Sequence, residues 1–516
     1  MEKPSKPRTF VHDLSGQSPI LWVITSLLTI VCVFVACSST HYISSITREV
    51  ITTTDSHTLE TCYQTCRISL VESVPQNLTI TKYPIPSTFE AWQFLISTAR
   101  HKIDVAAYKS SLRGMHVLGS MQQDFSVQGE MIYDELQSAG LNRNVRIRVV
   151  ENSPSKDRGD NADARSLHEQ GAIDRRSLNL QRIYNTGIMH SKFIISDESH
   201  FYLGSANLDW RSLNQVGVAL REPPIRSVQK LELGVLVRDC PCLARELEKV
   251  FGLYWKAATV RDAEEMEELI AHSSPLSFNT HNPLRIQYQG VETNVYIATS
   301  PKVEEAPEQT WDLDAIVEEI DNAKTVALIH VMDYFPMFLY AEKHEFWPRI
   351  DNSIRAAVLR GVHVKIICAA LHYPKIGLNF LKSLEQLNEV PTRGSIDVRI
   401  FKVPTPKHMK HLMQRERRTH KKFLVTDTAV VIGTSNWSGD YFEGIGTGVA
   451  IVVSQNTTID RPFVVKMRNV FMRDWDSDYT YSLDHYYDSC ISSKVPAEFC
   501  ETEKDKSLLA SSTTTA

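Results

Sequence analysis

The chain has 516 residues, of which 42% are hydrophobic and 23% are charged, and its formal net charge is −5. This composition excludes a disordered protein, and the negative net charge excludes a polycation that coats nucleic acid through bulk charge. The mean hydropathy of −0.22 excludes a protein that crosses the membrane many times, and the length predicts about two to four domains.

The first feature in chain order is an uncharged apolar segment, Ile20–Cys37, which reads ILWVITSLLTIVCVFVAC. It approaches the roughly 20 residues that a helix needs to cross a bilayer, and it exceeds the roughly 7–15 residues of a signal-peptide core. Basic residues before the segment favour a cytosolic N-terminus. We therefore expect a cytosolic tail over 1–19 and an uncleaved signal anchor over 20–38; a signal peptide cleaved near Ala36 is the alternative. The basic residues are Lys3, Lys6 and Arg8.

Residues 39–81 are rich in Ser and Thr and are expected to form a luminal stalk. The spacings Cys62-x-x-x-Cys66 and Cys240-x-Cys242 each resemble half of a zinc site, but an exported chain favours disulfides. The connectivity does not follow from one sequence, and the odd count leaves one thiol over, for which Cys500 is the candidate. The seven cysteines outside the apolar segment are Cys62, Cys66, Cys240, Cys242, Cys368, Cys490 and Cys500.

The rest of the chain contains a long internal repeat. Apolar positions at helical spacing over Phe89–Ala99 predict a helix, and the apolar runs that follow predict strands. The same order returns in the second half. Helices that alternate with strands indicate an α/β fold, and we expect two similar α/β/α halves, over residues 82–258 and 259–490, packed as an intrachain pseudo-dimer. The expected strands are Ile103–Ala107, Val145–Val150, Val326–Val331 and Val362–Ile367, the repeated helix is Leu313–Ala323, and a polar tail covers 491–516.

Each half carries the same motif, and the two copies lie about 230 positions apart. In both copies an apolar run separates Lys from Asp and another precedes a Gly, which predicts two buried strands joined by a turn. Taken singly, each residue has a structural explanation, such as a buried histidine or a turn aspartate. Recurrence with matched flanks favours function instead. The copies contain His190, Lys192, Asp197 and Asn207, and His420, Lys422, Asp427 and Asn436.

Two such motifs suit phosphoryl transfer without a metal or another cofactor. One neutral imidazole can attack phosphorus and form a phosphohistidine, while the other, as imidazolium, protonates the leaving oxygen. The lysines and asparagines can hold the non-bridging oxygens, where charge must be stabilised. Asp197 or Asp427 can orient a histidine and stabilise its charged form.

Both motifs match the HxKxxxxD pattern of the phospholipase D superfamily, which the chain therefore resembles. The flanking segments YLGSANLDWRSLNQ, LARELEKVF, FWPRID, GTSNWSGDYF and FMRDWDSDY look like those of the single-pass endolysosomal phospholipase-D-like proteins. The resemblance spans roughly Tyr83 to Tyr481. It implies a glycosylated type II membrane protein of the route from the endoplasmic reticulum and Golgi to the endosome and lysosome, with a luminal catalytic domain that could also be released in soluble form. It also implies an acid 5′→3′ exonuclease on single-stranded DNA and RNA, with transphosphatidylation of lysosomal phospholipids as the alternative activity.

The resemblance also implies roles for individual residues. One composite site would contain His190 as nucleophile and His420 as acid, although the reverse assignment stays open. Asp197 and Asp427 keep the third motif position. The phosphate would be bound by Lys192, Asn207, Lys422 and Asn436; Cys62 and Cys66 would pair with Cys240 and Cys242, and Cys368 with Cys490; Asn77 and Asn456 would carry glycans, whereas the sequon at Asn436 lies inside the motif.

The segment Val216–Gln229 departs from the family pattern, and its Pro223-Pro224 disfavours a regular helix or strand there. It is either a surface loop or an error in the gene model, and it begins close enough to Asn207 to disturb the site.

The substrate stays open between single-stranded nucleic acid and phospholipid. The basic stretch Lys407–Lys422 favours an anionic polymer, with an ordinary solvated loop as the alternative. Base stacking on Tyr334, Trp437 or Tyr441 would support such a polymer, with core packing as the alternative for each ring. A non-enzymatic membrane glycoprotein is disfavoured because both motifs are complete. The expected partners are thus the substrate, the membrane through the N-terminal helix, and, as an open question, a second copy in a homodimer.

Overall fold

The computed structural model describes residues 59–490, except for 76–77, 79, 81, 119–125, 156–158, 214–229, 303–308, 341–342, 371–373, 405–416 and 458–459. The chain from Cys62 onward forms one compact unit. In the part of the chain that is described, no helix combines the length and apolar character needed to cross a bilayer. The predicted anchor, the segment Val216–Gln229 and the tail over 491–516 lie outside the described residues.

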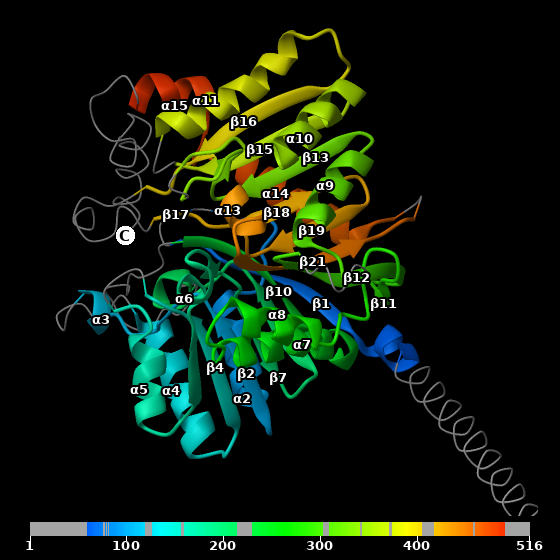
Figure 1. Ribbon diagram of the computed structural model, residues 1–516. Coiled ribbons are helices and arrows are strands. Elements are labelled where there is room, and N and C mark those ends of the chain that lie inside the picture. Colours follow the sequence, from blue (N-terminus) through cyan, green and yellow to red (C-terminus); the bar gives the residue numbers. More distant parts are fainter. Residues whose placement is uncertain are drawn as a thin grey trace, which may run out of the picture. The chain divides into compact units, whose positions relative to one another are not determined.

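The first half is built on one mixed sheet with the strand order β1-β10-β8-β7-β2-β4-β5 (Figure 1). Neighbours are parallel from β2 to β5 and antiparallel elsewhere along this order. The strands are β1 (Arg67–Ser73), β2 (Lys102–Ala107), β4 (Arg146–Asn152), β5 (Asp174–Leu178), β7 (Phe193–Ser196), β8 (His200–Gly204) and β10 (Lys230–Arg238), and the main helices are α2 (Thr88–Thr98), α4 (Val127–Leu141), α5 (Ala162–Glu169), α6 (Leu180–Tyr184), α7 (Pro241–Ala257) and α8 (Ala263–Ala271).

The second half is built on a sheet with the order β11-β12-β21-β19-β18-β13-β15-β16-β22. The strands are β11 (Leu284–Tyr288), β12 (Val291–Ser300), β13 (Val326–Val331), β15 (His363–Ala369), β16 (Ser395–Phe401), β18 (Lys422–Val425), β19 (Ala429–Gly433), β21 (Gly446–Ser454) and β22 (Thr480–Ser482). The helices are α9 (Asp312–Asn322), α10 (Arg349–Arg360), α11 (Pro374–Glu385), α13 (Gly439–Phe442), α14 (Pro462–Trp475) and α15 (Leu483–Cys490).

The two sheets repeat one arrangement, as the sequence predicted for an α/β fold. The run β10-β8-β7-β2-β4-β5 corresponds strand by strand to β21-β19-β18-β13-β15-β16. The predicted helices Phe89–Ala99 and Leu313–Ala323 are α2 and α9. Each of them precedes the strand that pairs with the motif strand of its own half, β2 with β7 and β13 with β18.

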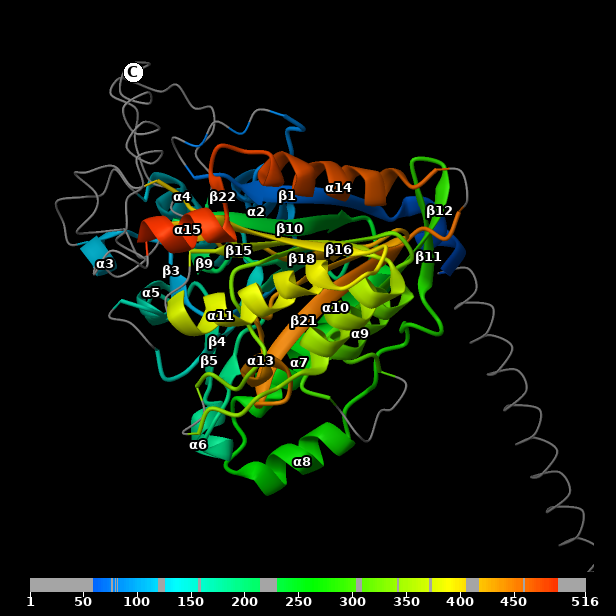
Figure 2. The ribbon, with the colours of Figure 1, turned by 90° about the horizontal axis from the view of Figure 1, so that it is seen from above.

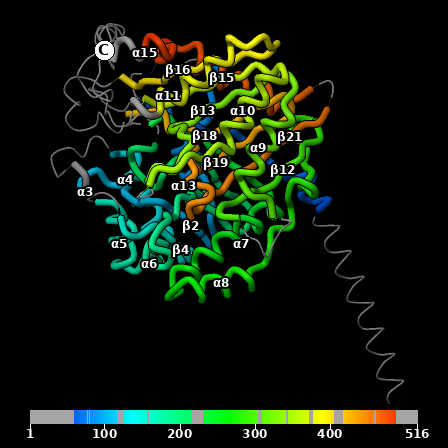
Figure 3. Tube along the Cα trace, turned by 45° about the horizontal axis from the view of Figure 1, so that its top comes forward, coloured from blue at the N-terminus to red at the C-terminus, as the bar shows by residue number. Residues whose placement is uncertain are grey.

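Short strands join the sheets at a seam. β17 (Arg418–Thr419) pairs with β10 of the first sheet, and β6 (Ile188–Met189) pairs with β21 of the second. Each sheet therefore receives a strand from the other half of the chain. One apolar core contains side chains from both sheets together with α7 and α14, which explains why the two sheets belong to one unit. In the Cα trace of Figure 3, β2 and β4 of the first half lie lower in the view than β18, β19 and β21 of the second half.

The stalk prediction is wrong for the residues that form β1. This strand pairs with β10 over its whole length, from Arg67 with Arg238 to Ser73 with Glu232. Its polar residues suggested an exposed segment, but their partners lie far away in sequence: the Ser73 hydroxyl donates to the Ser212 carbonyl at 2.6 Å, and Glu72 accepts from Arg473 of α14. A polar residue that is satisfied at long range gives no local sign of burial.

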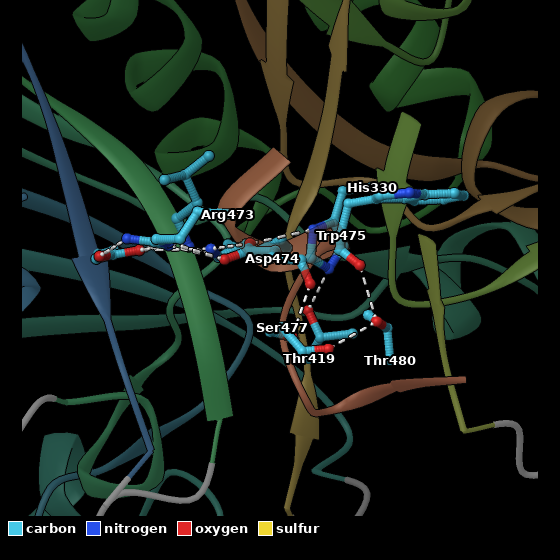
Figure 4. A network of polar contacts seen from close by, with 11 residues as sticks. His330, Thr419, Arg473, Asp474, Trp475, Ser477 and Thr480 are labelled. Carbon is cyan, nitrogen blue, oxygen red and sulfur yellow. Dashed lines mark hydrogen bonds and ion pairs between the residues drawn. The ribbon is translucent and has the colours of Figure 1, made fainter. Parts of the chain in front are cut away.

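A buried ionic network links β1, α14 and the second motif (Figure 4). Figure 2 shows the ribbons of β1 and α14 that carry two of its members. Arg473 donates to both carboxylate oxygens of Glu72, at 2.8 and 2.7 Å, and to Asp474 at 2.9 Å. Asp474 also accepts from the ammonium group of Lys421 at 2.7 Å, and both side chains are fully buried. Because Lys421 lies between His420 and Lys422, this network anchors the second motif to the core.

Candidate active site

The two motif histidines lie at the seam, and each is bound by the sheet of the other half. The backbone N–H of His190 donates to the Thr447 carbonyl of β21 at 3.2 Å. The backbone N–H of His420 donates to the Leu231 carbonyl of β10 at 2.8 Å. The structure therefore brings the two motifs together in one site, as the resemblance implied.

The motif lysines are buried and make matching contacts. Lys192 Nζ donates to the carbonyl of His190 at 2.5 Å, and Lys422 Nζ donates to the carbonyl of His420 at 2.7 Å. Burial, followed by the charge of Lys422, lowers the pKa of Lys192 well below its ordinary value. Burial lowers the pKa of Lys422 to about 7, against the attraction of Glu232. Both cations therefore face one shared, poorly solvated space.

The carboxylate beside a motif histidine belongs to Glu232 of β10, which the sequence reasoning missed. Its Oε2 lies 2.7 Å from His420 Nδ1, and it also accepts from the Ser205 hydroxyl at 2.5 Å. Its second oxygen accepts from the Ser212 hydroxyl at 2.7 Å. Burial raises the pKa of Glu232, while the charge of Lys422 opposes the rise. A glutamate inside the apolar run Leu231–Val235 was the available signal, since a fully buried carboxylate requires partners.

Asp197 and Asp427 do not orient the histidines, so this prediction is wrong. Asp197 accepts from the backbone N–H groups of residues 100, 101 and 102 at 2.8–2.9 Å. Asp427 accepts from the backbone N–H groups of Lys324 and Thr325 at 2.7 and 3.0 Å. Both carboxylates follow the motif strands and hold the turn before β2 or β13. Their spacing from His and Lys reflects the length of a strand and the need to close this turn.

His190 has different surroundings from His420. Its ring lies between two tyrosines, with ring centroids 5.0 Å from Tyr108 and 4.8 Å from Tyr441. Its Nδ1 is buried and has no hydrogen-bond partner among the described residues. Burial, and then the charges of Lys192 and Lys422, lower the pKa of His190 well below its ordinary value. Burial and Lys422 likewise lower the pKa of His420.

The two motif asparagines are buried and follow the glycine turns after β8 and β19. Asn207 and Asn436 each have a side-chain oxygen without a hydrogen-bond partner among the described residues. Asn436 also hydrogen-bonds the Tyr441 hydroxyl, which places it beside His190. An amide oxygen only accepts hydrogen bonds, so these two oxygens suit a ligand that offers an O–H or N–H donor, while the oxygens of a phosphate would accept from the amide nitrogens.

The aromatic candidates divide into two groups. Tyr334 of β14 (Tyr334–Phe335) and Trp437 of β20 (Trp437–Ser438) pair with each other and are buried, so core packing explains both. Tyr441 instead lines a cavity of about 440 Å³, and its ring also contacts that of His190, although no motif residue is among the described lining residues. The other lining side chains include Tyr108, Asn152, Ile188, Phe338 and Tyr340.

The predicted pairing of the first four cysteines is confirmed, as Cys62–Cys242 and Cys66–Cys240. These bonds attach the start of β1 to the start of α7. Cys368 is a free thiol buried in β15, in contradiction to the expected bond with Cys490, whose side chain lies outside the described residues. Burial raises the pKa of the Cys368 thiol, so it is an inert core group.

The glycosylation sites remain predictions. Asn456 is exposed after β21, and the buried Asn436 is closed to a glycan. Asn77 lies outside the described residues, as does most of the basic stretch Lys407–Lys422.

Glu151, which precedes the cavity residue Asn152, carries a prediction about acid stability. It is fully buried and accepts from the Ser110 hydroxyl at 2.8 Å and from Arg175. Burial raises its pKa to about 7. Between pH 4.5 and 7 the folded chain therefore keeps the proton of Glu151, whereas the unfolded chain has lost it. As the pH rises through this window, the contribution of the protonated Glu151 to the free energy of unfolding is lost.

Because of Glu151, the free energy of unfolding of the wild-type protein should fall by about 2–3 kcal/mol between pH 5 and pH 7. In Glu151→Gln we expect this fall to be absent. Urea unfolding of both proteins at the two pH values measures the effect. The exposed Glu169→Gln serves as control. An unchanged pH dependence in Glu151→Gln would contradict the assigned protonation.

Comparison with known proteins gives concordant matches. Residues 84–406 match the family described as "PLD3/4, PLD-like domain". The chain is 34% identical over 439 residues to the "5'-3' exonuclease PLD3" of Xenopus laevis, covering 83% of this chain and 84% of that protein. It is 33% identical over 450 residues to the "5'-3' exonuclease PLD4" of Mus musculus, covering 84% and 82%. The crystal structure of a phosphatidylserine synthase of Haemophilus influenzae Rd KW20 covers 83% of this chain and 91% of its own, with a TM-score of 0.53; at 13% identity it supports the fold alone.

Proposed function

Since the chain belongs to the PLD3/4 family of phospholipase-D-like proteins, we propose that it is a phosphodiesterase that removes nucleotides from the 5′ end of single-stranded DNA and RNA. The observation that carries this proposal is the composite site: two buried His-Lys pairs meet at the seam, and the two tyrosine rings that contact His190 also line a cavity. Its volume lies within the range of small-molecule pockets, and aromatic faces stack nucleobases of any sequence.

His190 suits the nucleophile. A nucleophilic imidazole must be neutral, and His190 has no carboxylate on Nδ1 among the described residues, whereas His420 has Glu232. Burial and the lysine charges lower the pKa of both histidines, so the carboxylate is the difference between them. Its ring nitrogen attacks phosphorus, the N–P bond forms, and the bond from phosphorus to the leaving oxygen breaks. The released end takes its proton from the second histidine.

His420 suits the acid. Its Nδ1 lies 2.7 Å from Glu232, a carboxylate that stabilises the imidazolium form. A bound phosphodiester brings a further negative charge among Lys192 and Lys422 and so opposes their effect on the histidine pKa. In the second step His420 accepts a proton from water, the water oxygen attacks phosphorus, and the N–P bond breaks. Activity is therefore expected to rise from pH 7 toward pH 5, as more His420 carries a proton.

The wider proposal concerns architecture and location. We propose that the two halves form an intrachain pseudo-dimer, which the matched strand orders support. We also propose that Ile20–Cys37 anchors a luminal enzyme in endolysosomal membranes. The apolar segment and the two disulfides support this location, because disulfides persist in exported proteins. A homodimer is a further proposal, which the mass of the purified protein tests.

The full chain in detergent at pH 5 tests the function. Labelled linear single strands with a 5′-hydroxyl, linear strands with a 5′-phosphate, circular single strands and phospholipid vesicles are compared. We expect stepwise release of mononucleotides from the 5′-hydroxyl strand and no cleavage of circles, because only a free end can enter the cavity. Cleavage of circles would show an endonuclease, and turnover of vesicle lipid alone would favour the transphosphatidylase.

A further inference from the structure

We infer that the two pseudo-equivalent ends of the site bind different parts of one strand. The apolar end, at Ile188 and Gly446, holds the terminal nucleoside, and the cationic end, at Lys230 and Arg418, binds the phosphate that follows the scissile one. This inference rests on the proposed nuclease function and deepens it.

The register of the strands defines these equivalent positions. In the first sheet Gly234 of β10 pairs with Gly204, the last residue of β8, the strand that follows the motif strand β7. In the second sheet Ala450 pairs with the corresponding Gly433. Lys230 lies four residues before Gly234, and Gly446 lies four residues before Ala450, so Lys230 and Gly446 are equivalent positions. The positions two before each histidine are likewise equivalent, and they are occupied by Arg418 and Ile188.

The structure pairs these four residues across the seam. Lys230 pairs with Arg418, and Ile188 pairs with Gly446. The same short ladder thus occurs twice, once with two cations and once with an isoleucine and a glycine. A symmetric site would bind the same group at both ends, so this difference in charge gives the site a direction.

The two cations share the face of the seam that carries the catalytic groups. Side chains two apart on a strand share a face, so Lys230 lies with Glu232, and Arg418 lies with His420. The Glu232–His420 contact of 2.7 Å fixes this as the face of the site. Thr419, between Arg418 and His420, turns the other way and bonds His330 at 2.7 Å.

Electrostatic effects agree with this placement. The charge of Lys230 lowers the pKa of Lys192, of Lys422 and of His420. The charge of Arg418 lowers the pKa of Lys422 and of His420. Both charges therefore act on groups of the two motifs, and the charge of Lys230 also lowers the pKa of the buried carboxyls of Glu232 and Asp209. A phosphate bound there would share Lys230 with these carboxylates.

The other end has the opposite character. Ile188 lines the cavity together with Tyr108 and Tyr441, the two rings that enclose His190. Gly187 precedes it with φ of 92°, a left-handed conformation, and a Cβ there would lie 2.1 Å from the Ile445 carbonyl oxygen. Glycine is thus required for β6 to approach β21 closely. The described lining combines aromatic rings with neutral polar side chains and the carboxylate of Asp440, and it contains no lysine or arginine. Such walls suit a nucleoside and disfavour a second phosphate.

A single-stranded nucleic acid matches this polarity. Its terminal nucleoside can fill the cavity, its first phosphodiester lies between the histidines, and its next phosphate lies over the two cations. A dinucleoside monophosphate has the first two parts and lacks the third. The inferred contact therefore distinguishes long substrates from the shortest one.

The test compares Arg418→Gln and Lys230→Gln in the full-length protein, with the exposed Arg261→Gln as matched control. The substrates are a linear strand of about twelve nucleotides and a dinucleoside monophosphate. For Arg418→Gln we expect kcat/KM on the long strand to fall about tenfold and kcat/KM on the dinucleoside monophosphate to fall less than about threefold. In a His190→Ala background, the slope of log Kd against log salt for the long strand should shrink by about 0.7 for each lost phosphate contact.

The outcomes are distinct. Equal losses on both substrates, or no loss on either, would overturn the inference and leave the nuclease function intact. If the wild-type protein cleaves neither nucleic acid but hydrolyses bis(p-nitrophenyl) phosphate, the proposed function fails and the inference fails with it. Arg418 is only half-buried, so its variant keeps the test decisive if the buried Lys230→Gln does not fold.

Discussion

Replacing His190 by alanine is expected to reduce turnover of every phosphodiester at least about 10³-fold, because the nucleophile that forms the covalent intermediate is lost. His420→Ala should behave differently with different leaving groups. An alkoxide needs the proton that His420 donates, whereas p-nitrophenolate leaves without one. With bis(p-nitrophenyl) phosphate we therefore expect His420→Ala to release about one p-nitrophenol per site in a burst and then stall, because the general base for the second step is missing.

Stopped-flow absorbance measures the burst, and intact-protein mass spectrometry after acid-free quenching identifies the phosphohistidine. A burst in His190→Ala and none in His420→Ala would reverse the assignment of the two roles. Glu232→Gln tests the partner of His420: it should slow cleavage of the alkoxide substrate about 10²-fold, with a smaller effect on the p-nitrophenyl ester, because it destabilises the imidazolium. Asp197→Asn serves as control, since its carboxylate binds backbone N–H groups at the turn before β2.

Replacing Asp474 by asparagine is expected to lower the unfolding free energy by about 3–5 kcal/mol, because it breaks a buried ion pair and leaves a cation uncompensated. The exposed fraction of both Asp474 and Lys421 is 0%, and Arg473 also loses a partner (Figure 4). Chemical denaturation in detergent measures the loss. The exposed Asp478→Asn, four residues away, should change stability by less than about 0.5 kcal/mol.

The pH dependence of this effect follows from the sign of the shift. Burial alone would raise the pKa of Asp474, but the charges of Lys421 and Arg473 outweigh it and hold the pKa far below the usual range. The ionised Asp474 contributes fully to the free energy of unfolding above the pKa of an unfolded aspartate, about 3.9, and this contribution is lost only in stronger acid. The destabilisation should thus be the same at pH 5 and pH 7. A loss confined to pH 7, or no loss at either pH, would contradict the role of the network.

Local patterns predicted the elements that depend on local order. The helical spacing over Phe89–Ala99 and the apolar run Ile103–Ala107 found α2 and β2, because amphipathic periodicity records which face of an element is buried. β1 was missed for the complementary reason. Its Glu72 and Ser73 look like surface residues until Arg473 and the Ser212 carbonyl, far along the chain, satisfy them.

The sequence by itself predicted which residues can carry the chemistry, because a repeated His-Lys pair with a following Asn is a pattern of side chains and needs no geometry. It also predicted an α/β fold with a repeated order of elements, and the two sheets have matching strand orders. Only the tertiary structure decided which carboxylate serves a histidine: Glu232 contacts His420 across 188 positions of sequence, whereas Asp197, seven residues after His190, binds backbone. It likewise decided the asymmetry of the site. Lys230 and Arg418, like Ile188 and Gly446, become neighbours only through strand pairing at the seam, and pairing between distant strands depends on the packing of both sheets rather than on either segment alone.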